Sequence, residues 1–257
     1  MSKKIKYNCL INATPSSANI DTTKYFDKLF RESRAPAIDN YFRKETDITK
    51  IIPIEENKEF NVLAYMVLLT IVSAVESYLR EVIRKTINID RISMEKCEEQ
   101  TITFGAACSH EEAHMLPEAI LEQYSFAKGD NIIDALHKLL GIPKCELSNE
   151  IKTVLDEFSK VCQLRHCIIH RYGKLGTNNA IKLGLEGHKV FIEKPIKFDL
   201  KLLEDTILIC HNTVKVVNNF LFSHLLDRLM DVKIPVWSWD YRKDKRLFNV
   251  YYETFYS

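Results

Sequence analysis

A long apolar stretch without charge most constrains how this chain can fold. No charged residue occurs from Val62 to Val75, and Glu76 ends the stretch. The apolar residues recur at helical spacing through about Ile87, which predicts one helix over 60–87 with a buried face. The charge-free segment is shorter than the about 20 residues that cross a bilayer. We therefore expect the core helix of a globular protein and no membrane partner.

Capping residues predict further helices on both sides of this core helix. Their expected ranges are Asp21–Glu32, a helix that begins at Ser109, 130–140, Ser148–Tyr172 and 201–230. Gly141 and Gly173 follow two of these ranges, where glycine commonly ends a helix. The pattern predicts a mainly α-helical protein.

A short segment after the Ser148–Tyr172 helix has a different pattern. Ala180–Leu185 and Lys189–Glu193 flank Glu186-Gly187-His188, which is typical of a small β-hairpin. The expected fold is therefore a mainly α helical bundle with a small β-hairpin. We expect three parts: an N-terminal extension with a short helix over 1–55, a helical domain over 56–232, and an aromatic and basic C-terminal tail over 233–257.

The charge balance excludes a polycation that coats nucleic acid. The 257 residues include 36 Lys and Arg against 35 Asp and Glu, which gives a net charge of +1. Any affinity for nucleic acid must therefore come from a local basic patch. The seven cysteines are odd in number and form no CxxC pair, which favours reduced thiols over a disulfide framework. The chain's start lacks the apolar run of a secretory signal. We expect a cytoplasmic location.

One cation occupies an unexpected position on the helix that begins at Ser148. Projected at about 100° per residue, Arg165 lies near the middle of the apolar arc, with His166 and His170 on its flank. A buried guanidinium needs a charged or hydrogen-bonded partner. Either the helix breaks or Arg165 reaches solvent at a bundle edge, or Glu76 on the first core helix pairs with it. We favour a partly buried Glu76–Arg165 pair.

The surroundings of Arg165 are locally basic. The segment from Phe158 to Leu185 contains no acid, and its basic residues are Lys160, Arg165, Arg171, Lys174 and Lys182. Such a run can be an ordinary solvated face. Its core-facing arginine and two histidines instead favour an anion site.

This set of side chains fits one reaction of RNA. Arginine presents a planar fork suited to phosphate, and histidine exchanges a proton near neutral pH. Attack by a ribose 2′-hydroxyl on its neighbouring phosphate needs both: His170 would move the proton and Arg165 would stabilise the phosphoryl charge. On a straight helix these two residues are about 140° and about 7.5 Å apart. A bend, or a second copy across a two-fold axis, would complete the site.

The motif resembles a known family. Arg165-His166-Cys167-Ile168-Ile169-His170, followed by Arg171-Tyr172-Gly173-Lys174, is similar to the R-polar-xxx-H motif of the HEPN superfamily, and most similar to its RiboL-PSP-like branch. The segment 73–80 around Glu76 resembles the branch's first long helix, in which an acid faces the motif arginine. The similarity covers about residues 56–232. His166 departs from the asparagine common at its position.

The resemblance implies a metal-independent endoribonuclease whose cleft forms between two motifs in a homodimer. Arg165 and His170 would be catalytic, His166 would assist and Glu76 would orient Arg165, with RNA bound by Lys160, Arg171, Tyr172 and Lys174. Relatives often act as toxins or antiviral-defence effectors, which implies a cognate inhibitor or a defence-system partner. No cofactor or metal is expected. The alternative is a catalytically inactive module of the same fold that binds RNA or a protein.

A competing motif spells HExxH. His110-Glu111-Glu112-Ala113-His114 matches a zinc-protease signature. Ser109 and Glu112 also match a capping box at a helix start, Pro117 follows soon after, and no convincing third ligand is found downstream. A zinc protease is therefore the third hypothesis.

The C-terminal tail has two interpretations. The segment from Trp239 to Arg246 mixes aromatic and cationic side chains that could grip single-stranded RNA. Alternatively, it packs against its own domain or a partner, which is the interpretation we favour.

Overall fold

A computed structural model describes residues 20–109, 112–231 and 237–257. The chain divides into two units, Met1–Arg34 and Ala35–Ser257. In the first unit the described residues include one 3₁₀ turn, η1 (Thr22–Tyr25), which Asp21 caps by accepting a hydrogen bond from the Thr23 amide. The helix expected to run to Glu32 is thus a single turn, because all described residues before Ser33 are exposed and no apolar face is buried to extend it.

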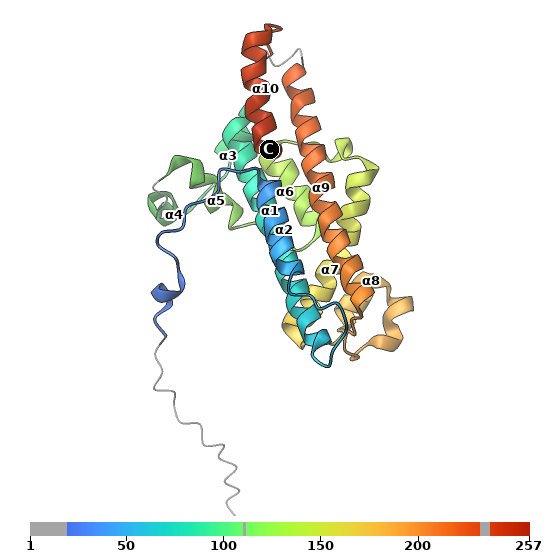
Figure 1. Ribbon diagram of the computed structural model, residues 1–257. Coiled ribbons are helices and arrows are strands. Elements are labelled where there is room, and N and C mark those ends of the chain that lie inside the picture. The colour runs from blue at the N-terminus through green and yellow to red at the C-terminus, as the bar shows by residue number, and fades with distance from the viewer. Residues whose placement is uncertain (1–19, 110–111, 232–236) are drawn as a thin grey trace, which may run out of the picture. The chain divides into compact units, whose positions relative to one another are not determined.

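The second unit is a bundle of helices, shown in Figure 1. Its helices are α1 (Ala37–Thr49), α2 (Phe60–Ile89), α3 (Arg91–Glu98), α4 (Phe104–Ser109), α5 (Leu116–Leu121), α6 (Gly129–Leu140), α7 (Asn149–Arg171), α8 (Thr177–His188), α9 (Leu200–Met230) and α10 (Tyr241–Phe255). Short 3₁₀ turns lie at Ala113–Met115 (η2), Lys144–Glu146 (η3) and Lys189–Phe191 (η4). The described residues form no β-strand, so the mainly α character is confirmed.

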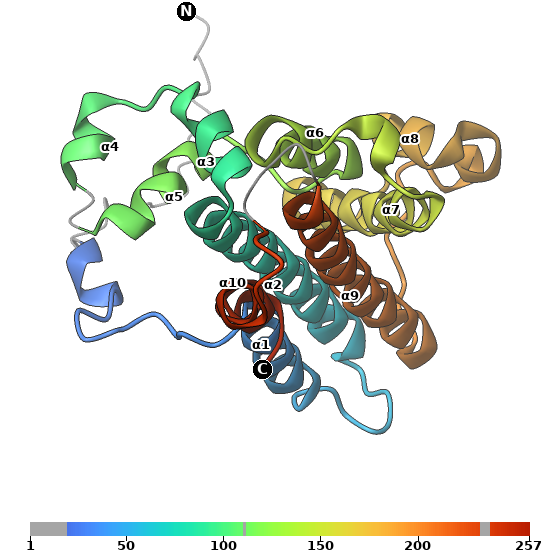
Figure 2. The ribbon, with the colours of Figure 1, turned by 90° about the horizontal axis from the view of Figure 1, so that it is seen from above.

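Helix α2 is the central element of the bundle. It packs against α1, α7 and α9, and Figure 2 shows it between α1 and α9. Val67, Leu68, Ile71, Val72 and Val75, all within the charge-free stretch, are fully buried. Within the described residues, α2 is the one helix long and apolar enough to cross a membrane, and more than half of that apolar window is buried by the protein itself.

Local signals explain where the predicted helices begin and end. Ser148 accepts a hydrogen bond from the Ile151 amide at the start of α7. At the other end Tyr172 and Gly173 take left-handed backbone conformations, with φ of 51° and 88°. Gly141 ends α6 in the same way, with φ 65°. These boundaries agree with the sequence prediction because a cap depends on residues within a few positions of the helix end.

The predicted β-hairpin is wrong. Its first part lies in α8, which is kinked at Gly184, and the residues expected as the turn, 186–188, end that helix. Its last part forms η4 and the turn after it. The alternating Ile181, Leu183 and Leu185 are exposed or only partly buried. A strand would have no neighbouring sheet to pair with in this helical bundle. Among the described residues, an isolated bridge joins Lys174 and Pro195.

The helix expected to begin at Ser109 is also wrong. Ser109 ends α4 and donates a hydrogen bond to the Gly105 carbonyl, so it does not begin a helix. The unit Ala35–Ser257 includes α1 and α10, which both pack against α2 and α9. Both helices bury an apolar face in the same core, which makes them part of one bundle.

Candidate functional site at the end of α7

The predicted motif occupies the last two turns of α7. Arg165, His166 and His170 all lie within this helix, which ends at Arg171 before the left-handed Tyr172. The helix is continuous from Asn149, and the bend considered from the sequence is not observed. Arg165 and His170 therefore point about 140° apart on the same helix. A single chain thus offers a phosphate either Arg165 or His170, and each side chain forms only part of a site.

The predicted contact between α2 and α7 is confirmed. The Arg165 Nη2 atom lies 3.6 Å from Glu76 Oε2, and the two side chains are 26% and 23% exposed. Arg165 Nε is buried without a hydrogen-bond partner. The guanidinium is therefore held by one carboxylate at the bundle surface and keeps hydrogen-bonding capacity of its own.

The two histidines stand next to each other on the exposed side of the helix. The ring centroids of His166 and His170 are 4.3 Å apart with the planes tilted by 49°, and both residues are exposed. Partial burial lowers the pKa of His166, and the charges of His170, Lys182 and Arg165 lower it further. A neutral His166 can accept a proton or a hydrogen bond at neutral pH.

A buried thiol lies behind the arginine. Cys162 is one turn before Arg165 and only 2% exposed. Burial raises the pKa of Cys162 to about 12, with Glu76 raising it and Arg165 lowering it. This thiol stays protonated and fills the core, so it supplies no nucleophile.

Two of the four predicted RNA-binding residues are engaged with acids. Arg171 Nη2 donates to both carboxylate oxygens of Glu193, at 2.6 and 2.8 Å. Lys160 Nζ lies 2.6 Å from Glu157. Both acids lie outside the segment from Phe158 to Leu185, which contains no acid. The basic patch expected from that segment is therefore partly neutralised by acids that lie beyond its two ends.

Tyr172 and Lys174 remain exposed beside the motif. The Tyr172 side chain is 77% exposed and meets the Tyr65 ring edge-on, with centroids 6.3 Å apart. Tyr65, which the sequence analysis did not select, donates a hydrogen bond from its hydroxyl to the Ile196 carbonyl at 2.7 Å. The Ile196 amide in turn donates to the Gly173 carbonyl at 2.9 Å, which links this segment to the turn after α7. Gly173 indicates how closely Tyr65 approaches this turn. A Cβ atom at position 173 would lie 2.3 Å from the Tyr65 hydroxyl, so glycine leaves room for the tyrosine ring.

A hollow of about 530 Å³ beside the motif helix carries mixed charge. Lys128, Lys160 and Lys182 line it together with acids of α6 and α7, among them Asp156 and Glu157. The balance of signs makes it a poor phosphate site.

The HExxH residues are only partly described. His110 and Glu111 lie outside the described residues. His114 is in η2, and its Nε2 atom lies 3.3 Å from Glu112 in an exposed pair. Glu118, the first acid downstream of the HExxH residues, pairs with Arg80 and Arg84. The described residues contain no group of three or more His, Cys, Asp or Glu side chains placed to hold a metal ion.

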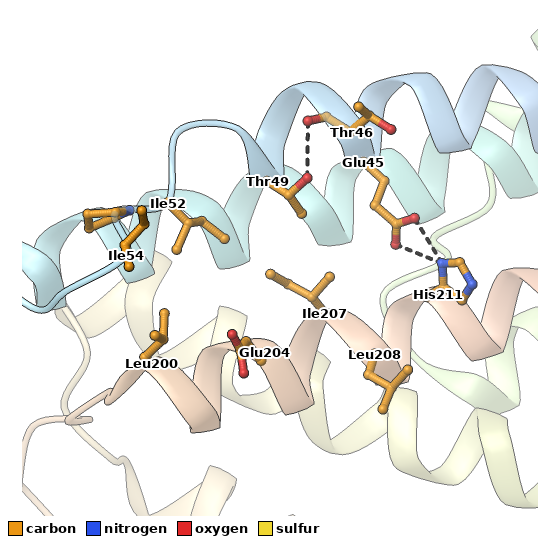
Figure 3. Close-up of a pocket in the computed structure, with 11 residues that line it drawn as sticks. Glu45, Thr46, Thr49, Ile52, Ile54, Leu200, Glu204, Ile207, Leu208 and His211 are labelled. Carbon is orange, nitrogen blue, oxygen red and sulfur yellow. Dashed lines mark hydrogen bonds and ion pairs between the residues drawn. The ribbon is translucent and has the colours of Figure 1, made fainter.

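A separate groove lies between the end of α1 and the first half of α9, and Figure 3 shows its lining. It has a volume of about 640 Å³. Its floor is aliphatic, with Ile52, Ile207 and Leu208, and its polar part is an ion pair in which His211 Nδ1 lies 2.8 Å from Glu45. Phe42 stacks on the His211 ring and holds it in place. None of the motif residues lines this groove.

Comparison of the chain with models of protein families, with curated proteins and with solved structures found no match.

Proposed function

We propose that the protein is a metal-independent endoribonuclease of HEPN type, in which two copies of the α7 motif form one cleft. The observation that carries the proposal is the largely buried Arg165, held by Glu76 from α2, with His166 and His170 exposed directly after it on α7. The proposal rests on this geometry together with the motif resemblance. A cytoplasmic role as a toxin or defence effector, with a cognate inhibitor or partner, belongs to the same proposal.

The chemistry needs no group beyond these side chains. The ribose 2′-oxygen attacks the adjacent phosphorus, the bond to the 5′-oxygen breaks, and the products are a 2′,3′-cyclic phosphate and a 5′-hydroxyl. His170 accepts the 2′-hydroxyl proton, and a second imidazole or water protonates the leaving oxygen. Arg165 donates hydrogen bonds to the phosphoryl oxygens as their charge grows. Glu76 is a positioning residue that orients the guanidinium.

A second copy solves the spatial problem of the single chain. Since Arg165 and His170 diverge on a continuous helix, a phosphate can meet both if a two-fold axis brings the partner's motif opposite. Ile169 of α7 and Tyr172, which directly follows that helix, are large side chains left 47% and 77% exposed beside the motif. Burying them between two copies would stabilise such a dimer.

The test is cleavage of labelled RNA by the purified full chain in excess chelator. We expect cleavage that Arg165→Ala and His170→Ala each reduce roughly a hundredfold or more. Matched controls are Arg91→Ala and His188→Ala, which remove the same residue types away from the motif and should leave cleavage unchanged. Cleavage retained in the motif variants would refute the assignment.

The same variants test whether the site is shared between copies. If Arg165 of one protomer works with His170 of the other, mixing the Arg165→Ala and His170→Ala proteins restores part of the activity, because mixed dimers contain one complete pair. RNA that is bound and left intact by the wild-type protein would support the inactive binding module. Stoichiometric zinc in the purified protein that His114→Ala removes would favour the zinc protease.

A further inference from the structure

The C-terminal helix α10 has two surfaces with different composition. Its second half is anchored in the bundle: Tyr251 and Phe255 are buried, and the Tyr251 hydroxyl lies 3.4 Å from Asp90, which in turn binds Arg228. Its first half carries four cations, Arg242, Lys243, Lys245 and Arg246, all exposed. The expectation that the tail packs on its own domain therefore holds for one face of α10, and the four cations lie outside that face.

The four cations share one face of the helix. At about 100° per residue they occupy an arc of about 160°, opposite the arc of Asp244, Tyr251 and Phe255. Within the described chain none of the four forms an ion pair with an acid. Their charge is therefore unneutralised, in contrast to that of Lys160 and Arg171 near the motif.

The acids of this segment are already occupied. Asp240 accepts hydrogen bonds from the amides of Arg242 and Lys243, and so caps the helix. Asp244 is 5% exposed and accepts from the Ser238 amide and hydroxyl. Neither carboxylate faces the four cations as a partner, and the surface stays strongly positive.

Two aromatic rings stand beside the cations. Trp239 and Tyr241 are 80% and 76% exposed, and Lys245 Nζ lies 5.7 Å from the Tyr241 ring centroid. Trp239 also has a left-handed backbone, with φ 59°, which is unfavourable for a bulky residue. Such rings gain nothing from burial in the free protein, and they are available for stacking.

We infer that this surface, which we call the α10 surface (Trp239, Tyr241, Arg242, Lys243, Lys245 and Arg246), binds single-stranded RNA. Unpaired cations follow the phosphate backbone and exposed aromatic rings stack on bases without strong sequence preference. The inference rests on the proposed function for its substrate class. It adds a second RNA contact on the chain, outside the motif, at the end of the bundle opposite α8 (Figure 1).

A membrane surface fits α10 less well. An interfacial helix needs a free apolar face to enter the acyl region, and the apolar face of α10 is already packed against α2 and α9. An acidic protein would match the cations and could also cover the two rings, because Tyr, Trp and Arg are enriched in protein interfaces. Single-stranded RNA is the favoured occupant because it is the substrate class of the proposed function and binds surfaces that combine cations with stacking rings. RNA uses both features.

The test measures binding of a fluorescent 2′-O-methyl oligouridylate to the full chain by anisotropy. This probe lacks the attacking hydroxyl, so binding is measured whether or not the protein cleaves RNA. The test variant carries Arg242→Gln, Lys243→Gln, Lys245→Gln and Arg246→Gln. The control removes the same charge from exposed sites elsewhere, with Arg43→Gln, Lys50→Gln, Lys58→Gln and Lys215→Gln.

We expect wild type and control to bind alike and the test variant to bind more weakly. The slope of log affinity against log salt should fall by about 0.7 for each RNA phosphate that the variant no longer neutralises. Trp239→Ala should weaken binding roughly 5- to 100-fold with the slope unchanged, because stacking carries no charge. All of these residues are exposed, so thermal unfolding should be unaffected.

Three results would overturn the inference: no binding by wild type, equal weakening in test variant and control, or cation-dependent binding to phosphatidylserine vesicles without oligonucleotide binding. These outcomes do not depend on whether the α7 motif cleaves RNA. Loss of cleavage in Arg165→Ala with binding intact tests the proposed nuclease, whereas loss of binding in the α10 variant tests this surface.

Discussion

The coupling between Glu76 and Arg165 offers a quantitative test of how the motif arginine is held. Replacing Glu76 with alanine removes the one carboxylate that the structure places beside the guanidinium. Arg165 then stays about three-quarters buried with its Nε already unpaired. We expect Glu76→Ala and Arg165→Met each to lower the free energy of unfolding, and the double variant to lower it by less than their sum.

The geometry sets the size of the effect. At the observed 3.6 Å, two unit charges attract by about 1 kcal/mol in water and by about 5 kcal/mol at an effective dielectric constant of about 20. Desolvation and side-chain entropy offset most of the larger figure. Exposed pairs give about 0.2–1 kcal/mol, so a pair only one-quarter exposed should show a coupling of about 1–2 kcal/mol.

The assay is urea unfolding followed by circular dichroism for wild type, both single variants and the double variant. Lys50 and Asp47 provide the control cycle, because this pair is closer, at 2.9 Å, but 67% and 75% exposed. Its coupling should be no more than about 0.5 kcal/mol. If the Glu76 and Arg165 effects add to within about 0.3 kcal/mol, the pair does not hold the arginine and the reasoning is refuted.

Two other predictions concern the same end of α7. Gly173→Ala should destabilise the protein by about 2–4 kcal/mol, because Gly173 has φ +88° and the new Cβ would lie 2.3 Å from the Tyr65 hydroxyl. Gly187→Ala, which meets nothing within 4 Å, is its control in the same urea assay, and equal effects would contradict the steric argument. The second prediction is a pH dependence: the lowered pKa of His166 means that the unfolded chain takes up the proton first, so stability falls as the pH drops from 6.5 through the folded pKa. His166→Asn should make this acid loss shallower, and an unchanged pH profile would show that His166 contributes nothing to it.

Much of the candidate site follows from local sequence patterns. Helical periodicity places Arg165 on the face of α7 that packs against α2. The residue that Arg165 contacts there is Glu76, the acid that ends the charge-free stretch. Helical periodicity depends on neighbours three and four positions apart, which a sequence displays directly. The pairing of Arg171 with Glu193 was missed because 22 residues and a whole helix separate the two.

The α8 segment shows the opposite case. Its alternating apolar residues favour a strand by local pattern, but it lies beside a helical bundle, where no sheet edge is present among the described residues. A strand gains most of its stability from a partner strand, and the segment folds as helix instead.

The amino-acid sequence by itself determined α2, α6, α7 and α9, the caps of α6 and α7 and the inward-facing arginine, because these depend on spacing within a few turns. Tertiary structure decided three things: that α1 and α10 belong to the same bundle, that acids outside the motif neutralise part of its basic face, and that the α10 cations stay unpaired. Each of these depends on which side chains meet across long separations in the chain, and such meetings exist only once the core has packed.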